Sequence, residues 1–132
     1  MMNQTPKIVV ITPVKNEVWI LDRFLAVTSQ FADCIIIADQ NSTDESKDIC
    51  KKYPKVIVID NKSTKYDEAE RQILLIKTAR ELVPEHKILL ALDADEILAA
   101  SATKTLGWQS MLKATPGTVL CFEKPDLYLT SN

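Results

Sequence analysis

The sequence has very little glycine. Its 132 residues include only Gly107 and Gly117, and neither follows the first apolar run of the chain. P-loops and dinucleotide-binding fingerprints need several glycines directly after the first strand, because the backbone must approach a phosphate closely there. Their absence excludes both motifs. A nucleotide bound by this chain would therefore be held without a glycine-rich phosphate cradle.

Histidine and cysteine are also scarce. His86, the single histidine, stands in the loop-like stretch VPEHK, and the three cysteines are far apart in the sequence. A Ser–His or Cys–His catalytic pair is poorly supported by one loop histidine, and a Cys/His metal site needs closely spaced ligands. We therefore assign His86 to the surface. Cys34, Cys50 and Cys121 are expected to be buried free thiols in a reducing compartment.

Long apolar runs and basic stripes are missing as well. The apolar runs are short and broken by acids, and the first residues lack the longer apolar core of a signal peptide. Lysine and arginine are scattered, and the net charge is −2, so nucleic acid is not an expected partner. With 46% apolar and 26% charged residues, the composition is that of an ordinary soluble domain. We expect one domain over residues 1–132, in the cytoplasm.

Apolar, strand-like runs alternate with amphipathic segments along the chain. Strands are predicted at residues 7–12, 34–39, 55–60, 87–93 and 118–124, and helices at 17–31, 42–53, 67–83 and 102–114. This alternation predicts a mainly parallel sheet with right-handed crossovers, and continuous apolar strands predict helices on both faces. The expected fold class is therefore α/β, a three-layer Rossmann-like sandwich.

Polar residues follow three of the predicted strands. The first strand ends in TPVKNE, the second in ADQNSTD and the fourth in LDADE. Ligands of open parallel sheets bind outside the carboxyl ends of the strands, so these three ends predict a binding crevice. The end of the third strand, IDNKSTKYD, is interpreted as an ordinary loop.

Asp93 and Asp95 are the acids whose spacing is most informative. If the chain stays extended through DAD, the two carboxylates lie on one side and repel each other unless a cation lies between them. Mg²⁺ binds one or two carboxylates and completes its shell with water and phosphate oxygens. The alternative is that Asp95 caps a helix beginning at Glu96. Other polar residues also have purely structural interpretations. Ser42 and Asp44 are interpreted as helix caps, with Ser42 and Glu45 as a capping box, and Lys65 and Arg71 as solvated charges.

Together these segments resemble the nucleotide-sugar-binding, N-terminal part of a family 2 glycosyltransferase with the A-type fold. The resemblance rests on IVVITPVKNEVWILDRFLAVTSQFADCIIIADQNSTDES, on EAERQILLIKTA and on the D-x-D in LLALDADEIL, in that order and spacing. It covers roughly residues 7–124. It implies transfer of a sugar from a nucleotide-sugar donor, with a preference for UDP, to an acceptor hydroxyl by an inverting mechanism.

The resemblance also implies residue roles. Thr12, Pro13 and Glu17 would line the nucleoside pocket, and Asp39 would accept a hydrogen bond from the base. Arg71 would lie near the nucleotide or its phosphates. Asp93 would face the ribose or the metal shell, and Asp95 would bind Mn²⁺ or Mg²⁺. The metal would act as a Lewis acid on the diphosphate leaving group. Gln40 and Asn41 replace the Asp-Gly common in the family, and Asn41 tolerates a left-handed turn.

Length is the larger departure from the family. Family 2 catalytic domains are longer than 132 residues, and their later half carries the acceptor site and the catalytic base. Only Glu123 and Asp126 remain as candidates for the base here, and neither has the expected context. We therefore expect a donor-binding half whose acceptor, a sugar or a lipid-linked molecule, binds elsewhere. Self-association, and peripheral membrane association within a longer protein, are further expectations.

Three other functions compete with the glycosyltransferase hypothesis. A haloacid-dehalogenase-type phosphotransferase also uses D-x-D, but places it after the first strand. A nucleotidyltransferase shares the sheet but uses a glycine-rich loop, which this chain lacks. A non-catalytic nucleotide-binding or scaffold module is consistent with the short chain.

Overall fold

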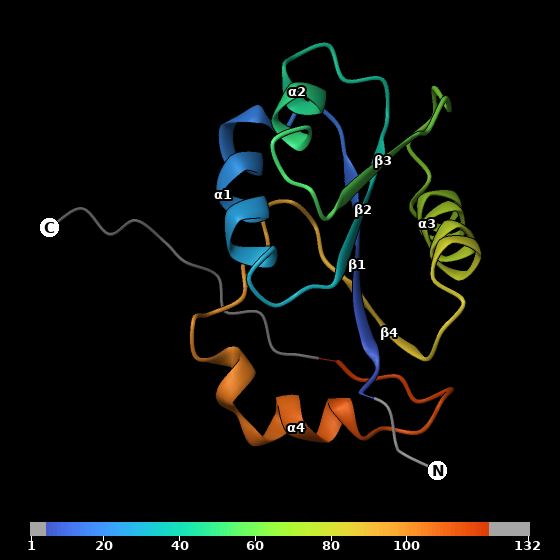
Figure 1. Ribbon diagram of the computed structural model, residues 1–132. Helices are drawn as coiled ribbons and strands as arrows, with labels where there is room; N and C mark the ends of the chain where they lie inside the picture. Colours follow the sequence, from blue (N-terminus) through green and yellow to red (C-terminus); the bar gives the residue numbers. More distant parts are fainter. Residues whose placement is uncertain (1–4, 122–132) are drawn as a thin grey trace, which may run out of the picture.

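Four parallel strands form the sheet of the protein in the computed structural model, which describes residues 5–121 (Figure 1). They are β1 (Lys7–Val14), β2 (Cys34–Asp39), β3 (Val56–Asp60) and β4 (Lys87–Ala91), in the order β3-β2-β1-β4. All three pairings are parallel. The predicted α/β class with a parallel sheet is therefore confirmed.

Helices cover both faces of this sheet (Figure 1). The helical elements are α1 (Val18–Thr28), α2 (Ser46–Cys50), α3 (Glu68–Leu82), the 3₁₀ turn η1 (Ala102–Lys104) and α4 (Leu106–Leu112). α3 lies on one face, whereas α1, α2 and α4 contribute to the core on the other. None of the helices in residues 5–121 is long and apolar enough to cross a membrane.

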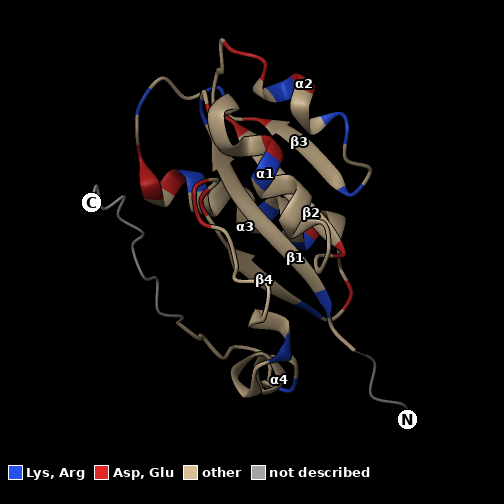
Figure 2. Ribbon diagram, turned by 90° about the vertical axis from the view of Figure 1, so that its left-hand side faces the viewer, with Lys and Arg blue, Asp and Glu red and all other residues tan. Residues whose placement is uncertain are grey.

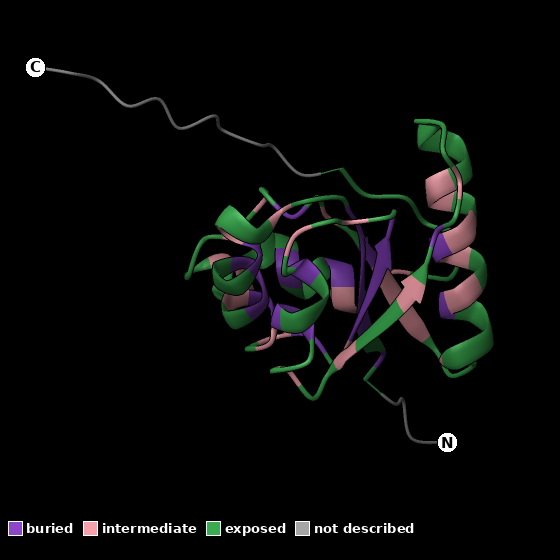
Figure 3. Ribbon diagram, turned by 90° about the horizontal axis from the view of Figure 1, so that it is seen from above, coloured by how far each residue is buried: buried purple, intermediate pink, exposed green. Residues whose placement is uncertain are grey.

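Alternating side chains of the two central strands fill both halves of the core. Val10 and Ile35 pack toward α1, whereas Val9 and Ile36 pack toward α3, and all four are fully buried. The burial therefore concentrates in β1 and β2, between the two helical layers (Figure 3). This explains why apolar residues follow one another without alternation in these strands, as in Ile8–Ile11 and Ile35–Ala38.

The predicted fifth strand, residues 118–124, is not present in its described part. Residues 118–121 have no strand structure, and residues 122–124 lie outside the described residues. A turn precedes them, in which the Thr118 N–H donates to the Thr115 carbonyl at 3.1 Å and Gly117 adopts a φ of 91°. The apolar run was the basis of the prediction, but a strand also needs a partner for its backbone groups.

Two predicted helices begin later than the sequence pattern indicates. The segment predicted at 102–114 is divided into η1 and α4 at Thr105, whose Oγ1 accepts from the Trp108 N–H at 3.1 Å. The helix predicted from Ser42 begins at Ser46, with Glu45 at its N-cap and no side-chain capping bond. The prediction of a capping box formed by Ser42 and Glu45 is therefore wrong.

Helix α3 offers a matched test of this core. Leu75 is fully buried against the sheet, whereas Ile73 on the same helix is 65% exposed. We expect Leu75→Ala to lower the free energy of unfolding by about 2–5 kcal/mol, because it leaves a cavity. Ile73→Ala should change it by less than about 0.5 kcal/mol. Urea unfolding measures both, and equal losses would contradict the packing described.

Candidate functional site at the carboxyl edge of the sheet

Two loops at the carboxyl edge are hydrogen-bonded to each other through Asn16. This residue adopts a φ of 53° in the middle of the β1–α1 loop. Its side-chain oxygen accepts from the N–H groups of Thr43 at 2.7 Å and Asp44 at 3.3 Å, and its own N–H donates to Ser42 Oγ at 3.0 Å. The loops that follow β1 and β2 thus form one unit. This is why residues 42–45 do not start a helix.

Asp44 and Ser46 complete the same unit at the helix starts. Asp44 Oδ2 accepts from the Val18 N–H at 3.2 Å and Oδ1 accepts from the Ser46 N–H at 2.9 Å. Ser46 Oγ accepts from the Glu17 N–H at 3.1 Å. Hydrogen bonding, first of all with Ser46, lowers the pKa of Asp44 below its ordinary value. Asp44 thus accepts from the first backbone N–H of both α1 and α2, although the N-cap positions themselves are held by Glu17 and Glu45.

Asp39 is a buried carboxylate at the end of β2, with only 2% of its surface exposed. Oδ2 accepts from the Ser42 N–H at 3.1 Å and lies 4.0 Å from Lys47 Nζ, which also pairs with Asp60 at 2.7 Å. Oδ1 is buried and has no hydrogen-bond partner within residues 5–121. A buried acceptor without a donor costs free energy, and a ligand N–H that reached this oxygen would offset that cost.

Gln40 attaches the β3–α3 loop to the same edge, which the sequence did not predict. It is buried, and its Nε2 donates to the carbonyls of Ser63 at 2.9 Å and Lys65 at 2.8 Å. Asn41, with a φ of 53° as expected for a left-handed turn, donates to the Ser63 carbonyl at 3.3 Å. The interpretation of IDNKSTKYD as an ordinary loop is therefore wrong. The two successive amide side chains after Asp39, those of Gln40 and Asn41, were the signal in the sequence that this loop is held at the edge.

Thr12 and Pro13 are both buried within β1, next to β2. Thr12 is fully buried, and its Oγ1 has no hydrogen-bond partner among the described residues. Pro13 lies beside Ala38 in the strand register, one residue before Asp39. These two predicted residues therefore lie at the floor of the edge formed by the loops after β1 and β2.

Glu17 shares an electrostatic neighbourhood with three other predicted residues. Burial raises the pKa of its carboxyl, a hydrogen bond from Trp19 Nε1 at 3.1 Å opposes this, and the charges of Asp95 and Asp93 raise the pKa further. The charge of Arg71 acts in the opposite direction. In Figure 2 the acidic turn after β4 and the first turn of α3 both lie toward the carboxyl ends of the strands. The tertiary structure thus gathers these residues at one edge.

The D-x-D segment forms a turn. The Glu96 N–H donates to the Asp93 carbonyl at 2.9 Å, and Glu96 Oε1 accepts from the Asp93 N–H at 2.8 Å. β4 ends at Ala91, so the extended conformation assumed for DAD is wrong. No helix begins at Glu96 in the described chain, so the cap interpretation of Asp95 is wrong too. Ala94 is buried between two exposed aspartates, which leaves Asp93 and Asp95 on the outer side of the turn.

Arg71 lies in the second turn of α3 and is not the solvated charge considered above. Its side chain is 11% exposed and makes an ion pair with Glu68 Oε2 at 3.9 Å. Nε is buried and has no hydrogen-bond partner among the described residues. A guanidinium has five N–H donors, and burying it short of acceptors is unfavourable. An anionic ligand at this edge would supply the acceptors.

Metal binding by protein groups alone is not supported in this part of the chain. Residues 5–121 contain no group of three or more His, Cys, Asp or Glu side chains that could hold a metal ion. Asp93 and Asp95 nevertheless suit an ion that takes one or two carboxylates and otherwise binds phosphate oxygens. The residues present therefore fit a metal that arrives with a diphosphate.

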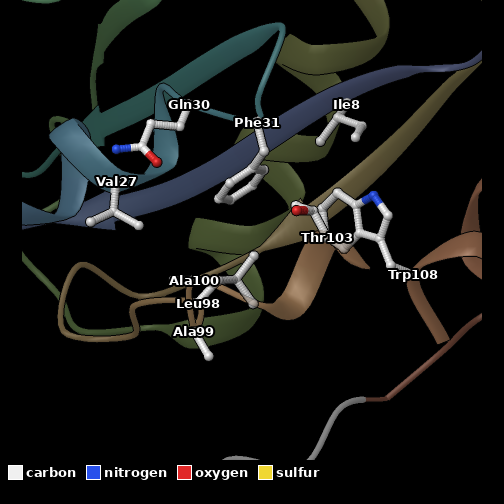
Figure 4. A pocket seen from close by; sticks show the side chains of 9 residues that line it. All are labelled: Ile8, Val27, Gln30, Phe31, Leu98, Ala99, Ala100, Thr103 and Trp108. Carbon is white, nitrogen blue, oxygen red and sulfur yellow. The ribbon is translucent and has the colours of Figure 1, made fainter. Parts of the chain in front are cut away.

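A separate cavity of about 340 Å³ lies beside the start of β1 (Figure 4). Its lining is mostly apolar and includes Phe31 and Trp108, whose rings meet edge to face with centroids 5.5 Å apart. None of the predicted site residues lines it. The cavity therefore belongs to the packing of α1 against the α4 region.

Comparison with known proteins decides the family. The model of a family described as "Glycosyl transferase family 2" matches residues 9–106, most of the chain. The chain belongs to this family. The match favours the glycosyltransferase hypothesis over the phosphotransferase and nucleotidyltransferase hypotheses. No curated protein matches the chain significantly.

Solved structures support the fold of this family 2 domain. Glucosyl-3-phosphoglycerate synthase from Mycobacterium tuberculosis, in complex with Mn²⁺, UDP and glucosyl-3-phosphoglycerate, is 19% identical with a TM-score of 0.51, over 68% of this chain and 34% of that one. 4-Diphosphocytidyl-2C-methyl-D-erythritol synthase is 17% identical with a TM-score of 0.57, over 72% of this chain and 49% of that one. The family 2 domain thus corresponds to about a third and a half of these proteins.

Asn16 and Asn41 provide a matched test of the loop unit, because both have positive φ. Replacing either with glycine adds similar freedom to the unfolded chain, but only Asn16→Gly removes the acceptor of two backbone N–H groups. We expect Asn16→Gly to be less stable than Asn41→Gly by about 1–2 kcal/mol in urea unfolding. Equal stability of the two variants would contradict the proposed importance of Asn16.

Glu17 predicts a pH dependence of stability. Its raised pKa means that the stability associated with the protonated carboxyl is present at low pH and is lost as pH rises through that pKa. Glu17→Gln should therefore unfold at higher urea than the natural chain at pH 7, and the difference should shrink toward about pH 4. Urea unfolding at both pH values measures this. A difference that does not vary with pH would rule the idea out.

Proposed function

We propose that this family 2 domain binds a UDP-sugar together with Mn²⁺ or Mg²⁺ at the carboxyl edge of its sheet. One observation carries the proposal. The described chain has four buried side-chain atoms without a hydrogen-bond partner, and three of them are Thr12 Oγ1, Asp39 Oδ1 and Arg71 Nε. All three belong to residues expected to contact a nucleotide. Such atoms are rare in folded proteins, and a ligand that pairs with them explains their burial.

The chemistry of these atoms suits the parts of a nucleoside diphosphate. Asp39 Oδ1 can accept from a base N–H, as the imide of uracil offers, and Asp39 is held in place by the Ser42 N–H. Thr12 and Pro13 lie on the neighbouring strand β1, where they would line the pocket for the base or ribose. The Arg71 guanidinium supplies donors and positive charge for the phosphates.

In this proposal Asp95 holds the metal ion, and Asp93 supports the metal shell or the ribose. When bound, the ion supplies Lewis-acid stabilisation of the charge on the diphosphate leaving group. Glu17 adds to the negative charge near both aspartates: burial is the main cause of its raised pKa, and the charges of Asp95 and Asp93 raise it further. A cation would relieve that repulsion. Mn²⁺ and UDP occur together in the structure of the mycobacterial synthase, which supports this pairing.

Transfer of the sugar requires more than this edge. The proposed reaction is an inverting transfer to an acceptor hydroxyl, for which a base must take the proton of that hydroxyl. Glu123 and Asp126, the candidates in the sequence, lie outside the described residues. The domain spans 34% of the synthase chain, so we place the acceptor site and the base beyond this donor half. Four further expectations for this chain stay predictions: a single domain, a cytoplasmic location, self-association and peripheral membrane association.

Calorimetry with UDP and Mn²⁺ tests this function. We expect metal-dependent UDP binding that Asp95→Ala weakens by at least about tenfold, because one ligand of a bridging ion is lost. Glu85→Ala is the matched control, since Glu85 is an exposed acid in the loop before β4, at the opposite edge. Its affinity should equal that of the natural chain.

Two outcomes would contradict the proposal in different ways. Absence of binding for any nucleoside diphosphate would favour a non-catalytic module. Binding that Asp95→Ala leaves unchanged would remove the metal role from the D-x-D segment.

A further inference from the structure

Tyr66 lies exposed beside the buried charge of Arg71. It precedes α3, and 77% of its surface is exposed, which is unusual for a large aromatic side chain. The Arg71 Cζ lies 5.1 Å from the centroid of its ring. A guanidinium at this distance from an aromatic face is attracted by the electrons of the ring. Tyr66 therefore makes a direct contact with the side chain that we assign to the phosphates.

The phenol of Tyr66 is itself held in place. Its hydroxyl donates to Glu68 Oε2 at 2.8 Å, and that same oxygen lies 3.9 Å from Arg71 Nη1. Glu68 is 55% exposed on its side chain, and 3.9 Å is beyond hydrogen-bonding distance. The carboxylate is thus a weak partner for the guanidinium, which also lies over the ring of Tyr66.

The backbone before Tyr66 is fixed by the site itself. Gln40 donates to the carbonyls of Ser63 and Lys65, and Asp67 caps α3 by accepting from the Glu70 N–H at 3.0 Å. Tyr66 lies between these two anchored points. The ring of Tyr66 can therefore contact Arg71 without being buried. The anchored backbone on both sides, and not packing in the core, keeps the exposed ring in place.

Resting on the function proposed above, we infer that Tyr66 is a positioning residue that orients the Arg71 guanidinium toward the diphosphate of the donor. The contact that carries this role is the one between the aromatic face and the guanidinium. The ring balances part of the charge of Arg71 without an anion, so the N–H donors stay available to phosphate oxygens. A carboxylate in full contact would compete with the ligand instead.

Calorimetry with three probes tests the inference: UDP with Mg²⁺, inorganic pyrophosphate with Mg²⁺, and uridine alone. Tyr66→Leu should weaken UDP and pyrophosphate binding by about 2- to 5-fold, the size of an exposed cation–π contact, and leave uridine binding unchanged. Tyr66→Phe should keep the natural affinities, because the ring remains. If Tyr66 only supported the fold, Tyr66→Leu would weaken the binding of uridine as much as that of the phosphate-containing probes. Thermal unfolding of each variant checks that the fold is kept.

Glu68→Gln distinguishes the ring from the carboxylate. It removes the ion pair with Arg71 but leaves the ring, so UDP affinity should stay the same or rise. The inference is overturned if Tyr66→Leu binds UDP like the natural chain, if it loses uridine and UDP alike, or if Glu68→Gln causes the same loss. Failure of the natural chain to bind UDP would instead refute the proposed function, and pyrophosphate binding would then still report on Tyr66 and Arg71.

Discussion

The site depends on the reciprocal hydrogen bonds between the loops that follow β1 and β2. Asn16 accepts from two N–H groups of the second loop and donates to Ser42, while Asp44 and Ser46 return bonds to the first helix. Each loop thereby satisfies backbone groups that the other leaves open at a helix start. Without this exchange, neither loop would have a defined conformation beside Asp39.

The same edge leaves some polar atoms without partners. Thr12, Asp39 and Arg71 are placed by well-bonded neighbours, yet each keeps one buried atom that no described group pairs with. A folded protein tolerates such a cost where binding offsets it. This edge of the sheet thus combines a fixed frame with unused hydrogen-bonding capacity, which are two properties that a ligand-binding site needs. Tyr66 extends this frame to the side chain of Arg71.

Much of this arrangement was readable from local pattern. The apolar runs predicted the four observed strands, and the polar strand ends located the edge where the candidate residues gather. The errors occurred where the outcome depended on contacts distant in sequence. Ser42 looked like a helix cap but bonds to Asn16, and the loop after β3 looked ordinary but is held by Gln40. The run at 118–121 has strand-like composition, yet its described part pairs with no strand.

The α/β class, the parallel sheet and the types of residue at the strand ends follow from the sequence, because hydrophobic periodicity and loop composition are local properties. Which of these residues lie close together follows from the tertiary structure. It brought Glu17, Arg71, Asp93 and Asp95 into one electrostatic neighbourhood, and it folded the D-x-D segment into a turn around the buried Ala94. Burial, hydrogen-bond partners and charge coupling arise between segments that are tens of residues apart, and no local pattern encodes them.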